Sequence, residues 1–590
     1  MSFTRLFDLL PHCLEKFPKE DALAAKESGT WVRYSTNDYY ENSVNLAYGL
    51  LKLGVKPSDK IGIIANNRPE WNFTDMACLM IGAIDIPIYP TISDHDLEFI
   101  IGDSEISYFF VSGKDLADKV RRCSGKNTAL KNIYCFNKVE GGRHWSEVLE
   151  SGKTNADPEK LKAIKSAIQP NDLATILYTS GTSGNPKGVM LSHANLISQL
   201  LAVKHLMPVD HRHRALSFLP LNHVYERMLT YNYFACGTSI YYAESMDTIS
   251  ANLQEVKPHI FTSVPRLLEK TYDRIVAKGS ELTGLKKKLF FWALELGLRY
   301  EMDGKNGTWY EIQLKLARKL IFVKWKEALG GELITTVSGG AALQDRLARV
   351  FWAANIPVLQ GYGLTETSPV VAVNYLAPGC NRFGTVGPLL DGVQVKIAED
   401  GEILVKGPNI MLGYYKNPAA TSEAITDGWF HTGDIGMLED GKFLKITDRK
   451  KEIFKTSGGK YITPSMIENK LRESPFVEQA MVIGENQKFA SALIVPSFSY
   501  LKDFCRKQNI NYTTNAEMIG NETVKIRIKE VIENMNKTLA QYETIKRFEL
   551  IPREWIIDEG ELTPKLNLKR KVILTNFKAS VDKIYGSDVL

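Results

Sequence analysis

A run of glycine and hydroxyl-bearing residues between Tyr178 and Gly188 is the strongest chemical signal in the chain. It reads YTSGTSGNPKG and follows the apolar run at 173–177. Such residues let backbone N–H groups gather around an anion, and Lys187 adds a positive charge. The pattern therefore predicts a phosphate-binding loop rather than a flexible linker. It is not a G-x-x-x-x-G-K-[ST] loop, because Pro186 precedes Lys187 and Gly188 follows it.

Three more motifs follow in a fixed order. They read QGYGLTET at 360–367, GWFHTGD at 428–434 and DRKKE at 448–452. With the loop, they resemble the adenylate-forming enzymes, which include acyl-CoA synthetases, luciferases and peptide-synthetase adenylation domains. The resemblance extends from about residue 10 to about residue 575. It implies a two-step reaction: a carboxylate attacks the α-phosphorus of ATP to give acyl-AMP and pyrophosphate, and a thiol, normally that of coenzyme A, then displaces AMP.

The resemblance also implies which residues bind ATP or AMP. These are Thr179, Ser180, Gly181, Thr182, Ser183, Gly184, Lys187, Gly340, Gln360, Gly361, Tyr362, Thr365, Asp434, Arg449 and Lys455. Glu366 and Thr179 would hold Mg²⁺, for which a carboxylate is a suitable hard ligand, and Thr365 would contact the phosphoryl group.

Tyr362 and Asp434 have further implied roles. The Tyr362 ring offers a flat face for adenine, and the alternative is an ordinary core tyrosine. Asp434 would accept hydrogen bonds from both ribose hydroxyls, with Arg449 nearby. A lone GD or DR dipeptide carries no information. Asp434 and Arg449 are therefore assigned these roles only because they belong to the ordered set of motifs.

The two half-reactions imply a hinge, and by resemblance it lies at Lys451. A plain solvated charge run explains RKKE equally well, and both interpretations can hold. The adjacent glycines Gly458 and Gly459 permit close backbone approach, and the resemblance places coenzyme A there. Thr463 and Pro464 are typical of an N-cap and first helical residue.

One position departs from the family pattern. The family carries a catalytic lysine in a stretch like L-T-P-T-x-K-x-x-R, whereas this chain has Asn567 at that position, flanked by Lys565 and Lys569. Three hypotheses follow: slow adenylation, no catalysis, or substitution by a neighbouring lysine. We favour substitution, because an extended segment would place 565, 567 and 569 on one face. Lys565 ranks ahead of Lys569, because its position differs from the family pattern by gaining a charge.

The acid is predicted from three motifs that resemble the long-chain fatty acid–CoA ligases. They read LPLNHVYER at 219–227, VPRLLEK at 264–270 and VSGGAAL at 337–343. His223 would be a gate beside the acyl carboxylate, and the alternative is a core histidine. Other hypotheses are ligation of an aryl, bile or other lipid acid to coenzyme A, ligation of acyl groups to a carrier protein, and a catalytically weak nucleotide- or lipid-binding relative.

Alternating helix and strand patterns predict the elements that position these motifs. We expect a helix over 36–53 with Thr36 as N-cap, strands over 60–65 and 83–89, and a helix over 70–82 between them. The fold class is α/β: a large N-terminal domain of helix-covered, mostly parallel sheets with a β-rich subdomain, and a small mobile α+β C-terminal domain.

The predicted domain boundaries follow the motifs and the changes in secondary-structure pattern along the sequence. The N-terminal domain spans 1–447, with a helical insert at about 272–329 and a β-rich part at about 385–447. A hairpin is expected over 393–398 and 402–406 and a strand over 443–447. A hinge at 448–451 precedes the mobile domain at 452–590.

The insert allows two interpretations. Ile312, Leu316, Leu320, Val323 and Ala328 recur near helical spacing, with lysines and arginines between them. The first interpretation is a helical hairpin packed on the core with its cations in water. The second is a basic amphipathic surface that meets anionic membrane lipid.

Composition excludes several classes. The chain has 590 residues, 44% hydrophobic and 24% charged, which is ordinary for a globular protein. A net charge of +5 over this length argues against a nucleic-acid partner. Seven scattered cysteines without a C-x-x-C pair argue against a disulfide framework or zinc site. The first ten residues lack a signal-peptide pattern, so we expect a cytoplasmic protein, peripheral to a membrane if the second interpretation of the insert holds.

Overall fold

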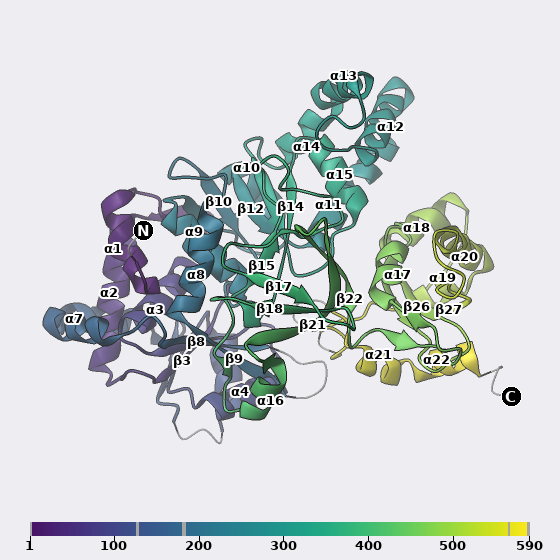
Figure 1. Cartoon of the computed structure of the whole chain (residues 1–590). Helices are drawn as coiled ribbons and strands as arrows, with labels where there is room; N and C mark the ends of the chain where they lie inside the picture. Colours follow the sequence, from purple (N-terminus) through teal and green to yellow (C-terminus); the bar gives the residue numbers. More distant parts are fainter. Residues whose placement is uncertain (1–2, 126–128, 180–184, 558, 564–566, 587–590) are drawn as a thin grey trace. The chain divides into compact units, whose positions relative to one another are not determined.

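The structure is a computed structural model that describes residues 3–125, 129–179, 185–557, 559–563 and 567–586 (Figure 1). The chain separates into two compact units. The first comprises Met1–Lys396, Leu404–His431 and Asp440–Leu444, and the second comprises Ile397–Ile403, Thr432–Glu439 and Lys445–Leu590.

The first unit contains two eight-stranded sheets. The first has the order β15-β14-β13-β12-β10-β11-β1-β2, and its strands are β1 (Leu23–Glu27), β2 (Thr30–Tyr34), β10 (Arg214–Ser217), β11 (Ser239–Tyr242), β12 (Ile260–Ser263), β13 (Thr335–Ser338), β14 (Val358–Gly363) and β15 (Val370–Val373). Pairing is parallel from β1 to β14 and antiparallel at both edges.

The second sheet has the order β19-β9-β8-β4-β3-β5-β6-β7. Its strands are β3 (Lys60–Ile64), β4 (Ile84–Pro87), β5 (Tyr108–Val111), β6 (Asn132–Cys135), β7 (Arg143–His144), β8 (Leu173–Thr179), β9 (Lys187–Ser192) and β19 (Gly413–Tyr414). It is parallel from β8 to β7 and antiparallel from β8 to β19. Two mostly parallel sheets confirm the predicted fold class.

Helices connect the strands of both sheets (Figure 1). They are η1 (Leu6–Asp8), α1 (Leu9–Lys16), α2 (Thr36–Lys52), α3 (Pro69–Met80), α4 (Asp94–Ser104), α5 (Lys114–Cys123), α6 (Ser146–Thr154), α7 (Pro158–Ala167), α8 (His193–Lys204), α9 (Val224–Ala235), α10 (Ile249–Val256), α15 (Asp345–Ala353), η3 (Thr365–Thr367) and α16 (Pro418–Ala424). The predicted helices over 36–53 and 70–82 are confirmed as α2 and α3, and the strands at 60–65 and 83–89 as β3 and β4.

The predicted N-cap of α2 was wrong by one residue. The Ser35 hydroxyl accepts the Asp38 N–H, and the Asp38 carboxylate accepts the Ser35 N–H, a reciprocal capping box. Thr36 is instead the first helical residue and donates its hydroxyl to the carbonyl of Phe17. Ser35 and Thr36 both carry hydroxyls that could cap the helix. Asp38, three residues after Ser35, forms the capping box with Ser35, which makes Ser35 the N-cap.

The helical insert consists of α11 (Pro265–Glu281), α12 (Gly284–Leu298), α13 (Thr308–Ala317), the π-helical turn η2 (Arg318–Phe322) and α14 (Val323–Ala328). It packs on the core through Tyr310, Leu314, Ala317 and Trp325. Ile312, Leu316, Leu320 and Val323 lie on the opposite, exposed side. The insert therefore packs on the core, as the first interpretation expects, but through residues other than the predicted stripe, because the helix is apolar on both sides.

The remaining strands form three smaller sheets. A six-stranded sheet has the order β16-β22-β21-β18-β17, with β20 paired to β21, and its strands are β16 (Gly387–Pro388), β17 (Gln394–Ile397), β18 (Glu402–Lys406), β20 (Ile425–Thr426), β21 (Trp429–Glu439) and β22 (Phe443–Arg449). The expected strands at 393–398, 402–406 and 443–447 correspond to β17, β18 and β22.

The second unit holds the other two sheets and a core of its own. Its strands are β23 (Phe454–Lys455), β24 (Tyr461–Ile462), β25 (Val477–Ile483), β26 (Ser491–Pro496) and β27 (Arg547–Leu550), and its helices are α17 (Pro464–Leu471), α18 (Phe498–Lys507), α19 (Asn515–Gly520), α20 (Glu522–Asn536), α21 (Arg570–Asn576) and α22 (Lys578–Tyr585). Leu493, Ile494, Ile528 and Trp555 are among the buried residues of that core. Pro464 begins α17 as expected, but the Thr463 side chain makes no capping hydrogen bond.

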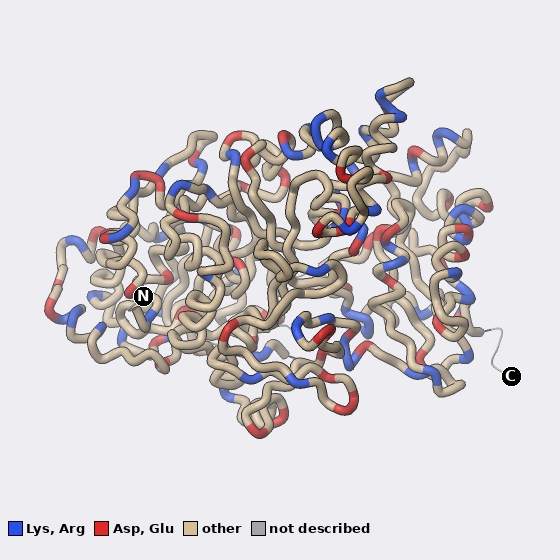
Figure 2. The backbone as a smooth tube through the Cα atoms, turned by 45° about the horizontal axis from the view of Figure 1, so that its top comes forward, with Lys and Arg blue, Asp and Glu red and all other residues tan. Residues whose placement is uncertain are grey.

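Charge and thiol chemistry complete the description. Positively and negatively charged residues are interspersed along the chain (Figure 2). The seven cysteines are free thiols, and all but Cys380 are buried. Within the described residues, no helix combines the length and apolarity needed to cross a bilayer.

Candidate functional site

The motifs of the first unit follow neighbouring parallel strands. His223 comes after β10, the VPRLLEK segment after β12, Gly340 after β13, and Thr365 and Glu366 after β14. The registers Ser263–Ser338 and Ser338–Gln360 align the ends of the last three strands. Because the carboxyl ends of parallel strands meet at one edge of a sheet, the fold brings these segments to a common edge, where α/β sheets bind ligands.

His223 lies at the start of α9 and caps that helix. Its Nδ1 accepts the N–H of Tyr225 at 3.0 Å, so the neutral ring carries its proton on Nε2. The Tyr225 hydroxyl donates to the carbonyl of Val337 at 3.1 Å, and a Cβ on Gly339 would lie 3.3 Å from the Tyr225 ring. The structure therefore brings two of the three long-chain motifs together.

The segment that leads to His223 is held by Asn67 and Asn222. The Asn67 amide donates to the carbonyl of Leu219 at 2.7 Å and accepts the N–H of Leu221 at 3.0 Å. Asn222 donates to the carbonyl of Ile88, directly after β4 of the second sheet. These bonds fix the loop from both sides before the helix begins, which restricts the position of the imidazole.

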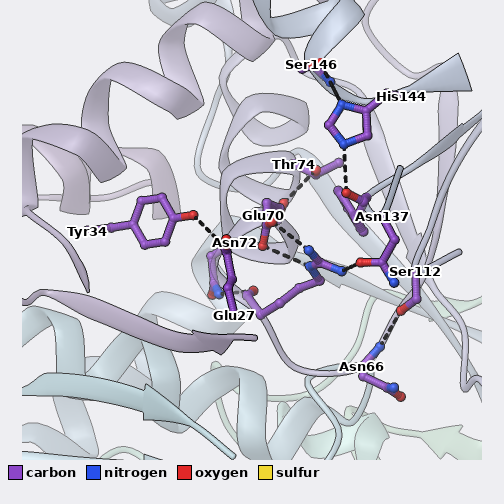
Figure 3. A network of polar contacts seen from close by, with 12 residues as sticks. Glu27, Tyr34, Asn66, Glu70, Asn72, Thr74, Ser112, Asn137, His144 and Ser146 are labelled. Atoms are coloured by element: carbon purple, nitrogen blue, oxygen red, sulfur yellow. Dashed lines mark hydrogen bonds and ion pairs between the residues drawn. The ribbon is translucent and has the colours of Figure 1, made fainter. Parts of the chain in front are cut away.

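A polar network anchors the turn that carries Asn67 (Figure 3). The Arg68 guanidinium donates to both Glu70 carboxylate oxygens, at 2.9 and 2.7 Å, and to Asn137 at 2.8 Å. The N–H of Asn66 donates to the hydroxyl of Ser112 at 3.0 Å. A bidentate arginine–carboxylate pair is geometrically specific, so the network orients the turn and, through Asn67, the His223 loop.

A second network is completely buried below α9. Arg227 forms ion pairs with Asp75 at 2.5 Å and Asp85 at 2.9 Å, and donates to the hydroxyl of Thr175 on β8 at 2.9 Å. Tyr231 donates to Asp75 at 2.5 Å. Burial raises the pKa of Asp85 to about 7, against the opposing effect of Arg227. One arginine shared by two carboxylates ties α9, α3, β4 and β8 together.

Strand β8 carries the start of the predicted phosphate loop and β9 carries its end. Tyr178 pairs with Gly188 and Thr179 with Lys187. The Tyr178 hydroxyl donates to Asp103 at 2.6 Å, and the Thr179 hydroxyl donates to the carbonyl of Lys187 at 3.4 Å. The predicted residues Ser180, Gly181, Thr182, Ser183 and Gly184 lie outside the described residues, so the phosphate contacts predicted for them stay predictions.

Tyr414 links two predicted residues that are far apart in sequence. Its hydroxyl donates to Glu366 Oε1 at 3.0 Å, and the ammonium of Lys187 lies 4.9 Å from the centre of its ring. Burial, and secondly the charge of Glu366, raise the pKa of the Tyr414 phenol, which keeps it a hydrogen-bond donor. The short strand β19 places it there by pairing Tyr414 with Val189 on β9.

The other nucleotide-binding residues predicted for the first unit lie on or beside β13 and β14. Tyr362 is half-buried on β14, opposite Ala372, and its predicted contact with adenine stays a prediction. Gly340 has φ +81° and open space around an added Cβ, and Gly361 meets Val373 at 3.4 Å. Thr365 is buried within η3.

In the second unit, Asp434 and Arg449 form a pair. Arg449 Nε lies 3.5 Å from Asp434 Oδ1, and the carboxylate is buried whereas the guanidinium is half exposed. They come from β21 and β22, which are neighbours in the six-stranded sheet. The N–H of Lys450 donates to the carbonyl of Gly433 at 2.8 Å. Two residues predicted to contact ribose are thus brought together by the sheet.

The predicted hinge and coenzyme A residues follow directly after β22. Lys451 is exposed in a turn, and the preceding Lys450 pairs with Asp400 and Glu402 at 2.6 and 2.8 Å. Gly458 and Gly459 lie in the turn between β23 and β24, with no atom within 3.9 Å of an added Cβ except Thr456. Lys455 lies 4.6 Å from the Tyr461 ring. Their functional roles stay predictions.

The segment around Asn567 differs from the extended strand that we assumed. Leu562 and Leu568 form an antiparallel bridge, and the N–H of Thr563 donates to the carbonyl of Asn567 at 2.9 Å. Leu562 and Thr563 thus pair with Leu568 and Asn567, which a single extended strand containing all four residues would not allow. Lys565 lies outside the described residues, and Lys569 precedes α21. The argument from an extended segment is therefore wrong. The catalytic roles of Lys565 and Lys569 stay predictions.

Sequence reasoning missed Tyr414 and the buried carboxylates. Tyr414 had no local signal, because its contact with Glu366 joins residues 48 positions apart. Asp85 did have one, because it interrupts the most apolar stretch of the chain, at 76–89, and a charge there is expected to be paired. Arg227, the partner, was visible as the last residue of LPLNHVYER.

Comparisons with known proteins decide the family. The model of the AMP-binding enzymes matches residues 10–415, and that of the AMP-binding enzyme C-terminal domain matches residues 451–588. The chain belongs to the AMP-binding enzymes. It is similar to the long-chain-fatty-acid–CoA ligase FadD15 of Mycobacterium bovis, with 33% identity over 95% of this chain and 93% of that protein. Long-chain-fatty-acid–CoA ligase 1 of Cavia porcellus is 32% identical, over 94% and 82%.

A solved structure supports the fold at greater sequence distance. The o-succinylbenzoate coenzyme A synthetase of Bacillus subtilis, in complex with ATP and magnesium ion, has a TM-score of 0.67 and 19% identity, covering 95% of this chain and 98% of that one. The family prediction made from the four motifs is confirmed. This AMP-binding enzyme is an adenylate-forming acyl-CoA ligase.

Proposed function

We propose that this AMP-binding enzyme converts a long-chain fatty acid, ATP and coenzyme A into acyl-CoA, AMP and pyrophosphate. One observation carries the choice of acid: relatives about one-third identical over nearly the whole chain are named as long-chain fatty acid–CoA ligases. The link between the LPLNHVYER and VSGGAAL segments, made by Tyr225 and Val337, supports it.

In the proposed first step, the fatty acid carboxylate attacks the α-phosphorus of ATP and pyrophosphate leaves. Lys187, at the end of the loop, supplies positive charge to the phosphates. Thr365, at the start of η3, contacts the phosphoryl group. His223, with its proton on Nε2, donates a hydrogen bond toward the acid and orients the attacking oxygen.

The residues predicted to hold the metal fit Mg²⁺. Within the described residues, no cluster of three or more His, Cys, Asp or Glu side chains could hold a metal. Mg²⁺ commonly retains waters and uses one or two carboxylates together with substrate phosphates. Glu366 and Thr179 are a set of that kind. When bound, Mg²⁺ would neutralise charge on the triphosphate, while Tyr414 holds Glu366 in place.

In the proposed second step, the coenzyme A thiol loses its proton, its sulfur attacks the acyl carbonyl, and AMP leaves. Asp434 and Arg449 position the ribose, and the turn with Gly458 and Gly459 admits coenzyme A. The thiol acceptor and the fatty acid are both part of the proposal, and a carrier protein is the competing acceptor.

An acid panel tests the proposal. The enzyme is given ATP, Mg²⁺ and coenzyme A with acetate, benzoate or saturated fatty acids of increasing length, and AMP, pyrophosphate and thioester are measured by mass spectrometry. We expect thioester from long-chain acids, one AMP per thioester, and little activity in Glu366→Gln. Products from acetate or benzoate alone would refute the long-chain assignment, and ADP with phosphate would refute the reaction itself.

A further inference from the structure

One face of the helical insert exposes large apolar side chains in a single row. They are Trp309, Ile312, Leu316, Leu320 and Val323, whose exposed fractions are 71%, 61%, 50%, 42% and 42%. Their spacings of three or four residues place them on one side of the continuous helix α13–η2–α14. We call these five residues the exposed row. A row this long is unusual, since apolar residues on a soluble surface normally occur singly.

The core does not need this row. The same helix packs inward through Tyr310, Leu314, Ala317 and Trp325, which are buried. The helix therefore already has an apolar face for folding, and the exposed row is a second one. With 21 residues from Thr308 to Ala328, the helix is about 30 Å long, and α12 and α13 project beyond the rest of the first unit (Figure 1).

Exposed lysines accompany the row. Lys315, Lys319 and Lys324 lie between and beside its members, and Glu327 is the exposed acid at the far end. Residues 284–328 contain ten Lys and Arg and five Asp and Glu, a net charge of +5 that equals that of all 590 residues. The neighbouring helix α12 adds exposed Lys286, Lys287 and Lys288. The exposed row thus lies in a segment of net positive charge.

We propose that the exposed row and its lysines form a docking surface for a membrane that carries anionic phospholipids. Apolar side chains combined with lysines are what an interfacial helix needs: the former enter the boundary of the acyl chains, and the latter meet anionic headgroups. A second copy of the chain fits less well, because self-pairing of this face would bring like-charged lysine rows together.

Vesicle flotation tests the docking surface. The whole chain is mixed at low ionic strength with phosphatidylcholine vesicles, with or without a fraction of phosphatidylglycerol. We expect wild-type protein to float with the anionic vesicles and to dissociate as salt is added, since the surface potential is screened. Failure to float with anionic vesicles at low salt would overturn the proposal.

Two sets of variants locate the contact. Leu316→Glu with Leu320→Glu should weaken binding at least about tenfold, because both lose burial in lipid. Leu201→Glu is the matched control: Leu201 is exposed to a similar extent, 47%, on α8. Each cation near an anionic surface strengthens binding about fivefold, so Lys315→Gln, Lys319→Gln and Lys324→Gln together should weaken it on the order of 100-fold. The control for charge is Lys153→Gln, Lys160→Gln and Lys162→Gln.

Quenching tests insertion in the unmodified protein. Phosphatidylcholine with brominated acyl chains should quench tryptophan fluorescence when anionic lipid is present, and Trp309→Phe should remove that quenching. Each variant is checked for an unchanged melting midpoint. Equal loss of binding in Leu201→Glu, or a dimer in sedimentation that Leu316→Glu and Leu320→Glu dissociate without any vesicle binding, would overturn the proposal.

Discussion

The hydroxyl of Tyr414 donates a 3.0 Å hydrogen bond to Oε1 of Glu366. The ring of the same tyrosine lies under the ammonium of Lys187, 4.9 Å from its centre. The N–H of Met411, on the segment that leads to Tyr414, also donates to the carbonyl of Glu366 at 3.0 Å. One side chain therefore fixes the relative position of the predicted metal-binding carboxylate and the predicted phosphate-binding lysine. Tyr414 is thus a positioning residue for both.

Tyr414→Phe should weaken the binding of ATP with Mg²⁺. The phenylalanine keeps the ring beneath Lys187 but leaves the Glu366 carboxylate without its donor, and a hydrogen bond to a charged group contributes enough to change affinity by about tenfold. Calorimetric titration with ATP measures this effect, once with Mg²⁺ and once with EDTA. We expect the loss in the presence of Mg²⁺ and little change with EDTA.

A double-mutant cycle separates positioning from general destabilisation. If Tyr414 acts through Glu366, Tyr414→Phe should have no further effect on Mg²⁺-dependent binding in a Glu366→Gln background. Tyr415→Phe is the control, because it removes a phenol from the adjacent residue. Equal losses with Mg²⁺ and with EDTA would show that Tyr414 has only a structural role.

The buried Glu226 should make stability depend on pH. Its carboxylate accepts hydrogen bonds from Ser217 and Thr262 and is fully buried. Burial raises its pKa from 4.5 to about 7. Between these two values the folded state binds a proton that the unfolded state does not, so the free energy of unfolding falls as pH rises through that window and is constant above it.

Glu226→Gln should remove this loss, since glutamine has nearly the same shape and does not titrate. The melting midpoint of the variant minus that of the wild type should rise from pH 5 to pH 8, measured by differential scanning calorimetry at matched ionic strength. A midpoint difference that is flat over this range would show that Glu226 does not titrate in the folded protein near pH 7.

A proline at the predicted hinge should separate the half-reactions. Lys451 is exposed in a turn, and within the described residues its N–H donates no backbone hydrogen bond. Lys451→Pro therefore fixes φ without breaking a bond of that kind. If the second unit must rotate between steps, acyl-AMP should still form while thioester formation falls strongly.

Lys451→Ala is the matched control for the hinge, because it removes the same side chain but leaves φ free. Acyl-AMP and acyl-CoA are measured by mass spectrometry in single-turnover reactions. A similar loss of both half-reactions in Lys451→Pro, or thioester loss in Lys451→Ala of the same size, would argue against a hinge at this residue.

The elements that the sequence predicts well are those bounded on both sides by turn residues. Strands β3 and β4 and helices α2 and α3 lie within one or two residues of their predicted ends, because turn residues bound each apolar run. The cap of α2 was misplaced between two hydroxyl residues. Helix α13–η2–α14 shows a different limit: periodicity predicts a helix, but with Ile312 outward and Leu314 inward, it cannot tell which apolar face meets the core.

The site could be predicted as a set of residues but not as contacts. Ordered motifs predict roles for Glu366, Asp434 and Arg449, and the sheet brings the last two together. Tyr414 could not be predicted, because its contact with Glu366, 48 residues away in sequence, depends on how β19 pairs with β9. Leu562 and Leu568, on either side of Asn567 in this segment, pair with each other, and no alternation rule anticipates that pairing.

The remaining question is which cation serves the reacting centre in place of a lysine at Asn567. Arg570 is an unsuitable source, because its guanidinium donates to both carboxylate oxygens of Glu468 at 2.7 Å and to Glu452 at 3.3 Å. The Lys569 N–H donates to the carbonyl of Glu561 at 2.8 Å, a hydrogen bond that does not involve the Lys569 side chain. Lys565 and Lys569 are therefore the two lysines to test.

We expect one of these lysines to carry the charge. Lys565→Ala or Lys569→Ala should lower acid-dependent exchange of pyrophosphate into ATP by at least about tenfold, since a lost transition-state donor typically costs more than this. Asn567→Lys should raise exchange, because it returns a cation to the family position. Lys571→Ala, an exposed lysine on α21, is the control and should have no effect. If both single variants and the double variant exchange at the wild-type rate, the charge comes from another residue, because losing both lysines would otherwise leave the negative centre without a cation from this segment.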